Sequence, residues 1–255
     1  MCKVTAGRQE KIRFLLQKHG NLTVSDLAQR FDVSEMTIRR DLKQLASMGL
    51  VQREHGKAVY PQVPQSRDGI FISRLGEAHK EKLAIGRAAA GLVQEGESII
   101  LDSGTTTLAI ALALNQKCIV VTNSLPVADV LGMRQEITTV LTGGEVQRNT
   151  LSLMGPMTRE SFSGFNADKL FLAATGVSAV KGLSTTSMGE SEVKQAMINA
   201  SKEVILVAHS EKLTRIFYHT FEKWDKINTF ITDSGADSNL LKKVEEYGVK
   251  VIVAT

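Results

Sequence analysis

Apolar residues recur at helical spacing along the first fifty residues of the chain. The spacing predicts helices over residues 8–19, 22–31 and 34–49, and only the turn Asp32-Val33 separates the second helix from the third. Ser34 suits the N-cap of the third helix because its hydroxyl can accept a free backbone N–H. Two helices joined by so tight a turn are typical of a helix-turn-helix.

Two short strands are predicted next, at residues 50–53 and 58–60, around a turn with a glycine and a lysine, which is typical of a wing. In the third helix Ile38, Leu42 and Leu45 share one apolar face, so the other faces are free to contact DNA. A small helical domain for protein contacts is the alternative. The candidate DNA-binding residues are Ser34, Glu35, Met36, Thr37, Arg39, Arg40, Lys43, Arg53, His55 and Lys57.

The positive charge of the chain is concentrated at its front. The 255 residues carry a formal net charge of +4, but residues 1–60 contain eleven Lys or Arg against six Asp or Glu. A basic module on a nearly neutral body favours double-stranded DNA as a partner. Apolar stretches stay far below the roughly 20 residues of a membrane span, and Cys2 and Cys118 have neither metal-ligand nor disulfide spacing. We therefore expect a cytoplasmic protein with no bound metal and no membrane contact.

A segment with two prolines, residues 60–67, resists both helix and sheet. We therefore expect a DNA-binding domain at residues 1–60, a linker at 61–75 and a second domain at 76–255. The second domain begins with a long helix predicted over 76–95. Buried strands and helices then alternate, which predicts a Rossmann-like α/β domain with a mostly parallel sheet. The predicted strands are 98–101, 119–122, 137–141, 169–173, 204–208, 229–232 and 250–253.

Small polar residues follow four of these strands, at the sheet edge where ligands bind in such folds. Residues 102–107 offer four hydroxyls and a glycine before an apolar helix over 108–114, which suits a phosphate. Ordinary capping is the alternative, although a cap needs only one hydroxyl. Lys194 can reach an anionic ligand, and a solvated lysine paired with Glu190 is the alternative there. The candidate effector-binding residues are Asp102, Ser103, Gly104, Thr105, Thr106, Thr107, Thr122, Asn123, Ser124, Gly143, Gly144, Glu145, Thr175, Gly176 and Lys194.

Several motifs are distributed along the chain: Leu27-Ala28, Phe31, residues 33–42 and 53–56, then 102–107, 121–124, 142–144 and the helix with Glu190, Glu192 and Lys194. These motifs resemble the DeoR family of bacterial sugar-responsive transcriptional repressors, and the resemblance covers nearly the whole chain. It implies a winged helix-turn-helix joined to a sensor domain that is similar in fold to ribose-5-phosphate isomerase. It also implies a phosphorylated sugar or related phosphate ester as effector, and a homodimer or homotetramer.

The chain departs from the family pattern at three places. Lys57 stands where many members have a second wing glycine, and it can add a phosphate contact. Many members have acidic residues in a Gly-Ala-Asp-Gly loop and a Val-Ala-Asp-Ser motif. This chain has Ala173-Ala174-Thr175-Gly176 and Val207-Ala208-His209-Ser210 at those places. A hydroxyl-binding role of the two carboxylates is therefore not carried over.

Two further classes of function stay open. The sequence has no P-loop, His-Glu-x-x-His, Cys-x-x-Cys or Gly-x-Ser-x-Gly motif. An isomerase is therefore supported only by the fold analogy, with Asp102, Glu145 or Glu190 as the candidate base. An architectural DNA-binding protein, whose second domain serves only assembly, is the other class. We expect a repressor that is not an enzyme, uses no cofactor, and leaves its operator when a phosphorylated sugar binds.

Overall fold

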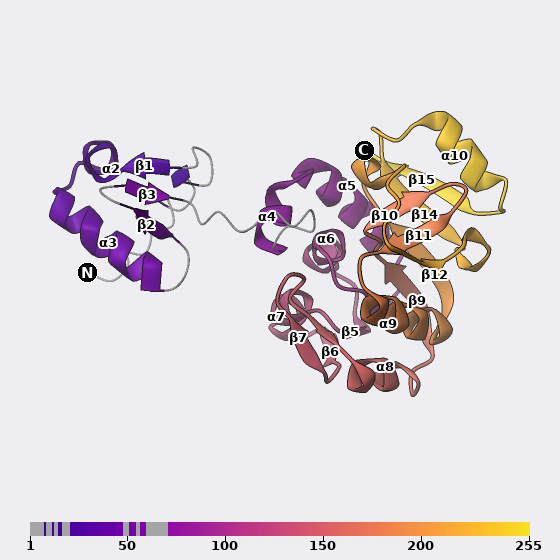
Figure 1. Ribbon diagram of the computed structural model, residues 1–255. Helices are drawn as coiled ribbons and strands as arrows, with labels where there is room; N and C mark the ends of the chain where they lie inside the picture. Colours follow the sequence, from indigo (N-terminus) through magenta and orange to yellow (C-terminus); the bar gives the residue numbers. More distant parts are fainter. Residues whose placement is uncertain are drawn as a thin grey trace. The chain divides into compact units, whose positions relative to one another are not determined.

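The computed structural model describes residues 8, 12, 15, 16, 21–47, 51–54, 57–59 and 71–255. The chain divides into two compact units, Met1–Asp68 and Gly69–Thr255 (Figure 1). Within the described ranges, none of the helices is both long enough and apolar enough to cross a membrane.

The first unit combines helices with a small antiparallel sheet. Its elements are β1 (Asn21–Thr23), α2 (Val24–Phe31), α3 (Glu35–Ser47), β2 (Gln52–Glu54) and β3 (Lys57–Val59), and the strand order is β1-β3-β2. The helix predicted from residue 22 begins two residues later, because Leu22 and Thr23 pair with the wing strand β3. Thr23 also closes a capping box: its hydroxyl accepts the Asp26 N–H at 3.0 Å, and the Asp26 carboxylate accepts the Thr23 N–H at 3.2 Å.

Apolar side chains from the helices and the wing form the core of this unit. Ile38, Leu42 and Leu45 are buried together on one face of α3, as their spacing predicted. Residues 8, 12, 15 and 16 are helical, and Ile12 and Leu16 are fully buried in the same core. The rest of the helix predicted over 8–19 lies outside the described residues.

The second unit is built on a seven-stranded sheet in which every neighbouring pair is parallel. Continuous apolar runs such as Ile99-Ile100-Leu101 suit strands that are buried on both faces. All seven predicted strands are present, with small shifts at their ends. In the order of the sheet they are β15 (Lys250–Ala254), β14 (Thr229–Asp233), β12 (Ser201–Val207), β9 (Ala167–Leu172), β4 (Ser98–Leu101), β5 (Cys118–Thr122) and β6 (Ile137–Leu141).

Helices cover both faces of this sheet (Figure 1). One hydrophobic cluster joins the sheet to α4 (Phe71–Gly76), α5 (His79–Ala90), α6 (Thr105–Ala113) and α7 (Leu125–Gly132). A second cluster joins it to α8 (Pro156–Phe162), α9 (Met188–Asn199) and α10 (Ser238–Glu245). The smaller elements are the hairpin β7 (Glu145–Gln147) and β8 (Ser152–Met154), the sheet β10 (Gly176–Ser178), β11 (Gly182–Thr185) and β13 (His219–Glu222), and the 3-10 turns η1 (Ser210–Lys212) and η2 (Trp224–Lys226).

The start of the second unit differs from the prediction. The helix predicted over 76–95 is shorter, because α5 begins at His79 after Ala78, which adopts a left-handed conformation with φ 45°. Residues 71–75, which we assigned to the linker, belong to the separate helix α4. The side chain of Phe71 is only 2% exposed and packs into the core of the second unit. Because Phe71 is anchored in this core, residues 71–75 form part of the second unit and not of the linker.

The strand order places the topological switch point of the sheet between β4 and β9. From β4 the chain continues to β5 and β6 on one side, whereas β9, β12, β14 and β15 lie on the other. Such a switch point is where open parallel sheets bind ligands, outside the carboxyl ends of the strands. Asp102 follows β4 at this edge and Ala173 follows β9.

Candidate functional site

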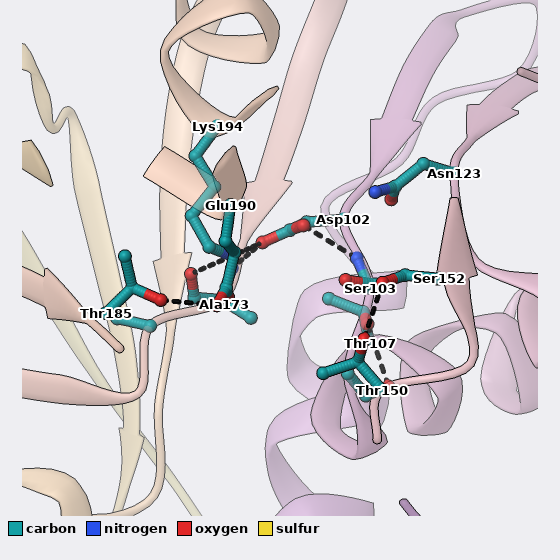
Figure 2. A network of polar contacts seen from close by, with 12 residues as sticks. Asp102, Ser103, Thr107, Asn123, Thr150, Ser152, Ala173, Thr185, Glu190 and Lys194 are labelled. Carbon is teal, nitrogen blue, oxygen red and sulfur yellow. Dashed lines mark hydrogen bonds and ion pairs between the residues drawn. The ribbon is translucent and has the colours of Figure 1, made fainter. Parts of the chain in front are cut away.

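A buried ionic network joins the two strands at the switch point (Figure 2). The Lys194 ammonium, from α9, lies 2.5 Å from the Asp102 carboxylate and 3.3 Å from that of Glu190. It also donates to the carbonyl oxygen of Ala173 at 3.0 Å. Asp102 in turn accepts the backbone N–H groups of Ser103 at 2.7 Å and Ala173 at 2.9 Å. The network thus fixes the ends of β4 and β9 to one face of α9.

The environment sets the charge of this network. Lys194 is 1% exposed, and burial alone would lower its pKa, but Asp102 and Glu190 outweigh that effect and raise it above its ordinary value. Burial acts against the charged form of Glu190 as well, but Lys194 and a hydrogen bond from Thr185 lower the pKa of Glu190 below its ordinary value. The solvated alternative for Lys194 was therefore wrong, while its pairing with Glu190 is present.

Beside Asp102, the amino end of α6 presents a group of buried hydroxyls. Ser103, Thr105, Thr106 and Thr107 are all at most 7% exposed. The N-cap is Gly104, and no side chain caps the helix, so ordinary capping does not account for these hydroxyls. Thr107 donates to the Gly104 carbonyl at 3.0 Å, whereas the Thr106 hydroxyl is buried without a partner. Free N–H groups and a free hydroxyl at a helix start suit an anion.

The structure adds cationic residues that the sequence reasoning missed. The half-buried Lys212 follows β12 and donates to the Ala174 carbonyl at 2.6 Å. Burial lowers its pKa well below the ordinary value, and the charges of Arg74 and Lys82 add to this effect. Lys82, on α5, is 4% exposed, and burial together with the Arg74 charge lowers its pKa to about 8. The charges of Arg74, Lys82 and Lys212, which form this cationic group, therefore act on one another, and Lys212 lies at the end of β9, where it contacts Ala174.

This cationic group and the α6 hydroxyls lie at the same sheet edge. Helix α5 leads into β4 and α6 leaves it, so both begin at the carboxyl end of that strand. The two helices pack closely: a Cβ on Gly86 would lie 2.6 Å from the carbonyl carbon of Ala109.

A signal for Lys212 was present in the sequence, because it follows a predicted strand end by a few residues. Lys82 and Arg74 had none, because helical lysine and arginine residues are usually solvated.

The polar residues after β5 and β6 play a different part. Thr122 donates to the Leu101 carbonyl at 2.7 Å, and Ser124 caps α7, so both hydroxyls have structural partners. The Asn123 amide donates to Leu153 at 3.0 Å, while its oxygen is buried without a partner. Asn123 is therefore the member of this group that retains a free acceptor for a ligand.

Three further candidates are held away from the ionic network. A Cβ on Gly144 would lie 2.0 Å from the Thr158 hydroxyl, and the exposed Glu145 belongs to the β7–β8 hairpin after the edge strand β6. The neighbouring Gly143 accepts a hydrogen bond from Thr158 at 2.7 Å. The glycine pair thus serves close packing against α8 rather than approach to a ligand.

The two departures after β9 and β12 leave neutral groups at the site edge. Thr175 is half-buried, and its N–H donates to Ser184 at 3.2 Å, whereas a Cβ on Gly176 would lie 2.4 Å from the Arg215 carbonyl oxygen. His209 is 5% exposed and its Nδ1 atom is buried without a partner. Burial and the nearby Lys212 lower the pKa of His209 to about 3, so the imidazole is neutral at physiological pH.

Helix α3 of the first unit presents a polar face to solvent. The Ser34 hydroxyl accepts the Thr37 N–H at 3.3 Å, which is the predicted N-cap contact. Arg39 forms an exposed pair with Glu35 at 3.2 Å. Met36 is 76% exposed, and the side chains of Arg40, Lys43 and the wing residue Lys57 are exposed as well. His55 and the side chain of Arg53 lie outside the described residues.

Both units match known protein families. Residues 8–63 match the DeoR-like helix-turn-helix domain, and residues 77–234 match the DeoR C terminal sensor domain. The HTH-type transcriptional regulator YulB of Bacillus subtilis is 35% identical, over 97% of this chain and 96% of its own length. The lactose phosphotransferase system repressor of Streptococcus mutans is 31% identical, over 94% and 96%. Among solved structures, ribose 5-phosphate isomerase A of Methanocaldococcus jannaschii superposes with a TM-score of 0.40 at 17% identity, covering 53% of this chain and 55% of that one.

These matches extend over both units and agree with the motifs noted in the sequence. The relatives they identify are transcriptional regulators and repressors, not enzymes. The chain belongs to the DeoR family of transcriptional repressors, with a DeoR-like helix-turn-helix followed by a DeoR sensor domain.

Proposed function

We propose that this chain is a cytoplasmic repressor of a carbohydrate-metabolism operon, and that a phosphorylated sugar or related phosphate ester releases it from operator DNA. The first unit binds the DNA as part of a homodimer or homotetramer, and the second unit binds the effector. The observation that carries the proposal is the group of charges at the β4–β9 switch point, where cationic side chains lie near an acidic part. The name of the lactose phosphotransferase system repressor supports the carbohydrate link.

The two parts of the site suit the two ends of a phosphosugar. The amino end of α6, with Lys82 and Lys212, supplies N–H groups and cations for a phosphate. Asp102 and Glu190 supply carboxylate oxygens that can accept hydrogen bonds from sugar hydroxyls. Both parts lie at the carboxyl edge of the sheet, and a phosphate ester without hydroxyls would use only the first.

The DNA-binding proposal rests on the exposed face of α3. Its apolar residues are buried in the unit, so Glu35 to Lys43 leave a polar and basic face that a major groove can accept. Exposed Arg40 and Lys57 can hold phosphates. Two such units in a symmetric oligomer would read repeated or inverted half-sites.

The test is binding of purified protein to an operator fragment at fixed salt, with and without a panel of phosphosugars. The fragment is selected from random duplexes by the protein itself. We expect one class of sugar phosphate to release specific DNA and to raise the melting temperature of the protein in proportion to its binding. If no sugar phosphate does either, the second unit serves only assembly and the effector proposal fails. Isomerisation of a pentose or hexose phosphate by the protein would favour the enzyme reading instead.

A further inference from the structure

Buried polar atoms without a hydrogen-bond partner gather at one edge of the large sheet. In the part of the chain that the structure describes, these atoms belong to Thr106, Asn123, Thr139, Thr142, His209 and Thr232. All of these residues except Thr139 lie at or just past the carboxyl end of a parallel strand. Buried polar groups in folded proteins are nearly always paired. Their concentration at this edge therefore indicates a place where a ligand supplies the missing partners.

Three of the polar residues at this edge, Asp102, Asn123 and Thr142, form a row across the neighbouring strands β4, β5 and β6. Each member of this polar row directly follows the last register partner of its strand, and these partners are Leu101, Thr122 and Leu141. Side chains alternate between the two faces of a sheet. The polar row therefore shares a face with the residues two positions earlier, which pack in the cluster of α8 and α9. Lys194 of α9 reaches Asp102 from that face.

The Asn123 amide has its nitrogen engaged and its oxygen free. The Nδ2 atom donates to the Leu153 carbonyl at 3.0 Å, and the backbone carbonyl of Asn123 accepts the Leu153 N–H at 2.7 Å. These two contacts with β8 fix the residue, which is 1% exposed. An amide oxygen can only accept hydrogen bonds, so the free oxygen requires a donor such as a hydroxyl. Figure 2 shows Asn123 on the opposite side of Asp102 from Lys194 and Glu190.

Thr142 offers a second neutral group next to Asn123. Its side chain is 6% exposed, and its hydroxyl lacks a partner among the described residues. Its backbone N–H continues the ladder by donating to Thr122 at 3.0 Å, so the position of the residue is set by the sheet. The polar row thus ends in two uncharged groups, whereas the cationic group lies beyond β9 and on α5.

We propose that Asn123 and Thr142 bind hydroxyl groups on the carbon skeleton of the effector, and that they restrict the effector to a phosphorylated sugar of five or six carbons. The inference rests on the effector site proposed above. Neighbouring strands are roughly 4.8 Å apart, so the polar row spans about 10 Å. A phosphorylated three-carbon compound has too few free hydroxyls to pair with all three members of the row.

The free oxygen of Asn123 also gives the site a means of rejecting other ligands. A compound with a carbonyl group or a hydrogen atom in place of the hydroxyl would leave this buried acceptor unpaired, and such a loss is unfavourable. Inorganic phosphate does not depend on the polar row, because it carries no carbon skeleton. Binding of phosphate and recognition of the sugar are therefore separable by experiment.

The experiment measures binding to the full-length chain by calorimetry. The probes are inorganic phosphate, glycerol 3-phosphate, ribose 5-phosphate, glucose 6-phosphate, galactose 6-phosphate and fructose 6-phosphate. The variants are Thr142→Val and Asn123→Leu. Thr139→Val is the matched control, because Thr139 lies on the same strand β6 and its hydroxyl is also buried without a partner, but it is not at the carboxyl edge.

We expect the wild type to bind at least one of the four sugar phosphates more tightly than inorganic phosphate and glycerol 3-phosphate. Thr142→Val should weaken binding of that sugar phosphate roughly fivefold, as for loss of one neutral hydrogen bond, and Asn123→Leu should weaken it at least as much. Both variants should keep the wild-type affinity for inorganic phosphate. Thr139→Val should bind every probe as the wild type does.

Equal affinity of Thr142→Val and wild type for the sugar phosphate would overturn the inference. It would also be overturned if glycerol 3-phosphate bound as tightly as every sugar phosphate, or if phosphate affinity fell by the same factor as sugar affinity. Asn123→Leu also removes the contact with Leu153, so if this variant does not fold, Thr142→Val decides, because valine keeps the shape of threonine. The proposed function fails separately: a sugar phosphate then binds with the expected response to the variants but does not release the selected operator.

Discussion

The Lys194 ammonium lies 2.5 Å from the Asp102 carboxylate, although 92 positions separate the two residues in the chain. Both side chains are almost fully buried, and Glu190 adds a second carboxylate at 3.3 Å. A buried charge that loses its partner is strongly destabilising, because its desolvation is no longer offset. The pair therefore connects the integrity of the proposed effector site to the stability of the whole sensor unit.

Replacing Lys194 with Met should destabilise the second unit by about 3–5 kcal/mol, because Asp102 and Glu190 are left as unpaired buried carboxylates. The free energy of unfolding is measured in urea from the fluorescence of Trp224, the only tryptophan of the chain and a buried residue of this unit. The matched control is Lys202→Met, which removes a lysine from an exposed pair with Asp168 and should change little. Equal effects of the two substitutions would contradict a stabilising role for the buried pair.

Replacing Arg40 with Ala should weaken operator binding without changing the response to effector. The side chain is exposed on α3, so its removal should change the stability of the fold little. It should, however, remove one contact with the DNA. A lost guanine contact costs about 1–3 kcal/mol at one base position, whereas a lost phosphate contact lowers the salt dependence of binding by about 0.9 in slope. Titration of labelled operator at several salt concentrations distinguishes the two.

Arg39→Ala tests the same face, with the difference that Arg39 gives up a pair with Glu35 when it contacts DNA. Arg87→Ala on α5 is the control for loss of one positive charge. Unchanged operator affinity in both the Arg39 and Arg40 variants would remove the assignment of α3 as the recognition helix.

Replacing both Thr105 and Thr106 with Val should weaken effector binding and leave operator binding unchanged. Valine keeps the shape of the side chain, and the Thr106 hydroxyl has no partner in the fold, so the unliganded protein should lose little stability. The rise in melting temperature with a sugar phosphate should be lost, while operator affinity without ligand stays the same. Thr139→Val on β6 is the control, because that hydroxyl is likewise buried without a partner. An undiminished thermal shift in the double variant would exclude the start of α6 as the phosphate site.

Anion binding should take up protons and weaken as the pH rises. Burial and the neighbouring cations lower the pKa of Lys212 well below its ordinary value, and that of Lys82 to about 8. A bound dianion raises both pKa values, so the protein gains protons on binding wherever the free lysines are partly neutral. Sulfate is the probe, because it does not titrate near neutral pH. Its affinity should fall as the pH rises through about 8.

Calorimetry in two buffers with different ionisation enthalpies measures the number of protons taken up. Lys212→Met should reduce that number, because one of the two titrating lysines is gone. The other charged groups that influence Lys212 are Arg74, Lys194 and Glu190. Proton release on sulfate binding, or affinity that rises with pH, would contradict the assignment of these lysines to the anion site.

Local spacing in the sequence was sufficient for most of the architecture. The face shared by Ile38, Leu42 and Leu45 identified α3, and apolar runs identified all seven strands of the large sheet. The rule that ligands bind after parallel strands directed attention to Asp102 and the hydroxyls that follow it. These features depend on neighbours within a few residues along the chain, and the sequence shows such neighbours directly.

Features that depend on distant partners were decided by the tertiary structure. Leu22 and Thr23 were placed in the second helix from the spacing of apolar residues but pair with the wing strand β3, and Phe71 makes α4 part of the sensor core. Gly144 fits its position because a side chain there would clash with Thr158, and not because a ligand approaches it. In each case a contact across the fold outweighed the local preference of the chain.

The charge of the proposed effector site is the clearest example. The sequence singled out Lys194 alone among these cations, and the fold brings it together with Lys82, Lys212 and Arg74 from four separate elements. Burial and the neighbouring cations lower the pKa values of Lys82 and Lys212, whereas Asp102 and Glu190 outweigh burial and raise that of Lys194. None of these effects can be evaluated without the distances between the groups. The sequence determined which elements form and where a ligand should be sought. Only the packing of those elements decided which charges the ligand would meet, because electrostatic energy depends on separation in space and on exclusion of water.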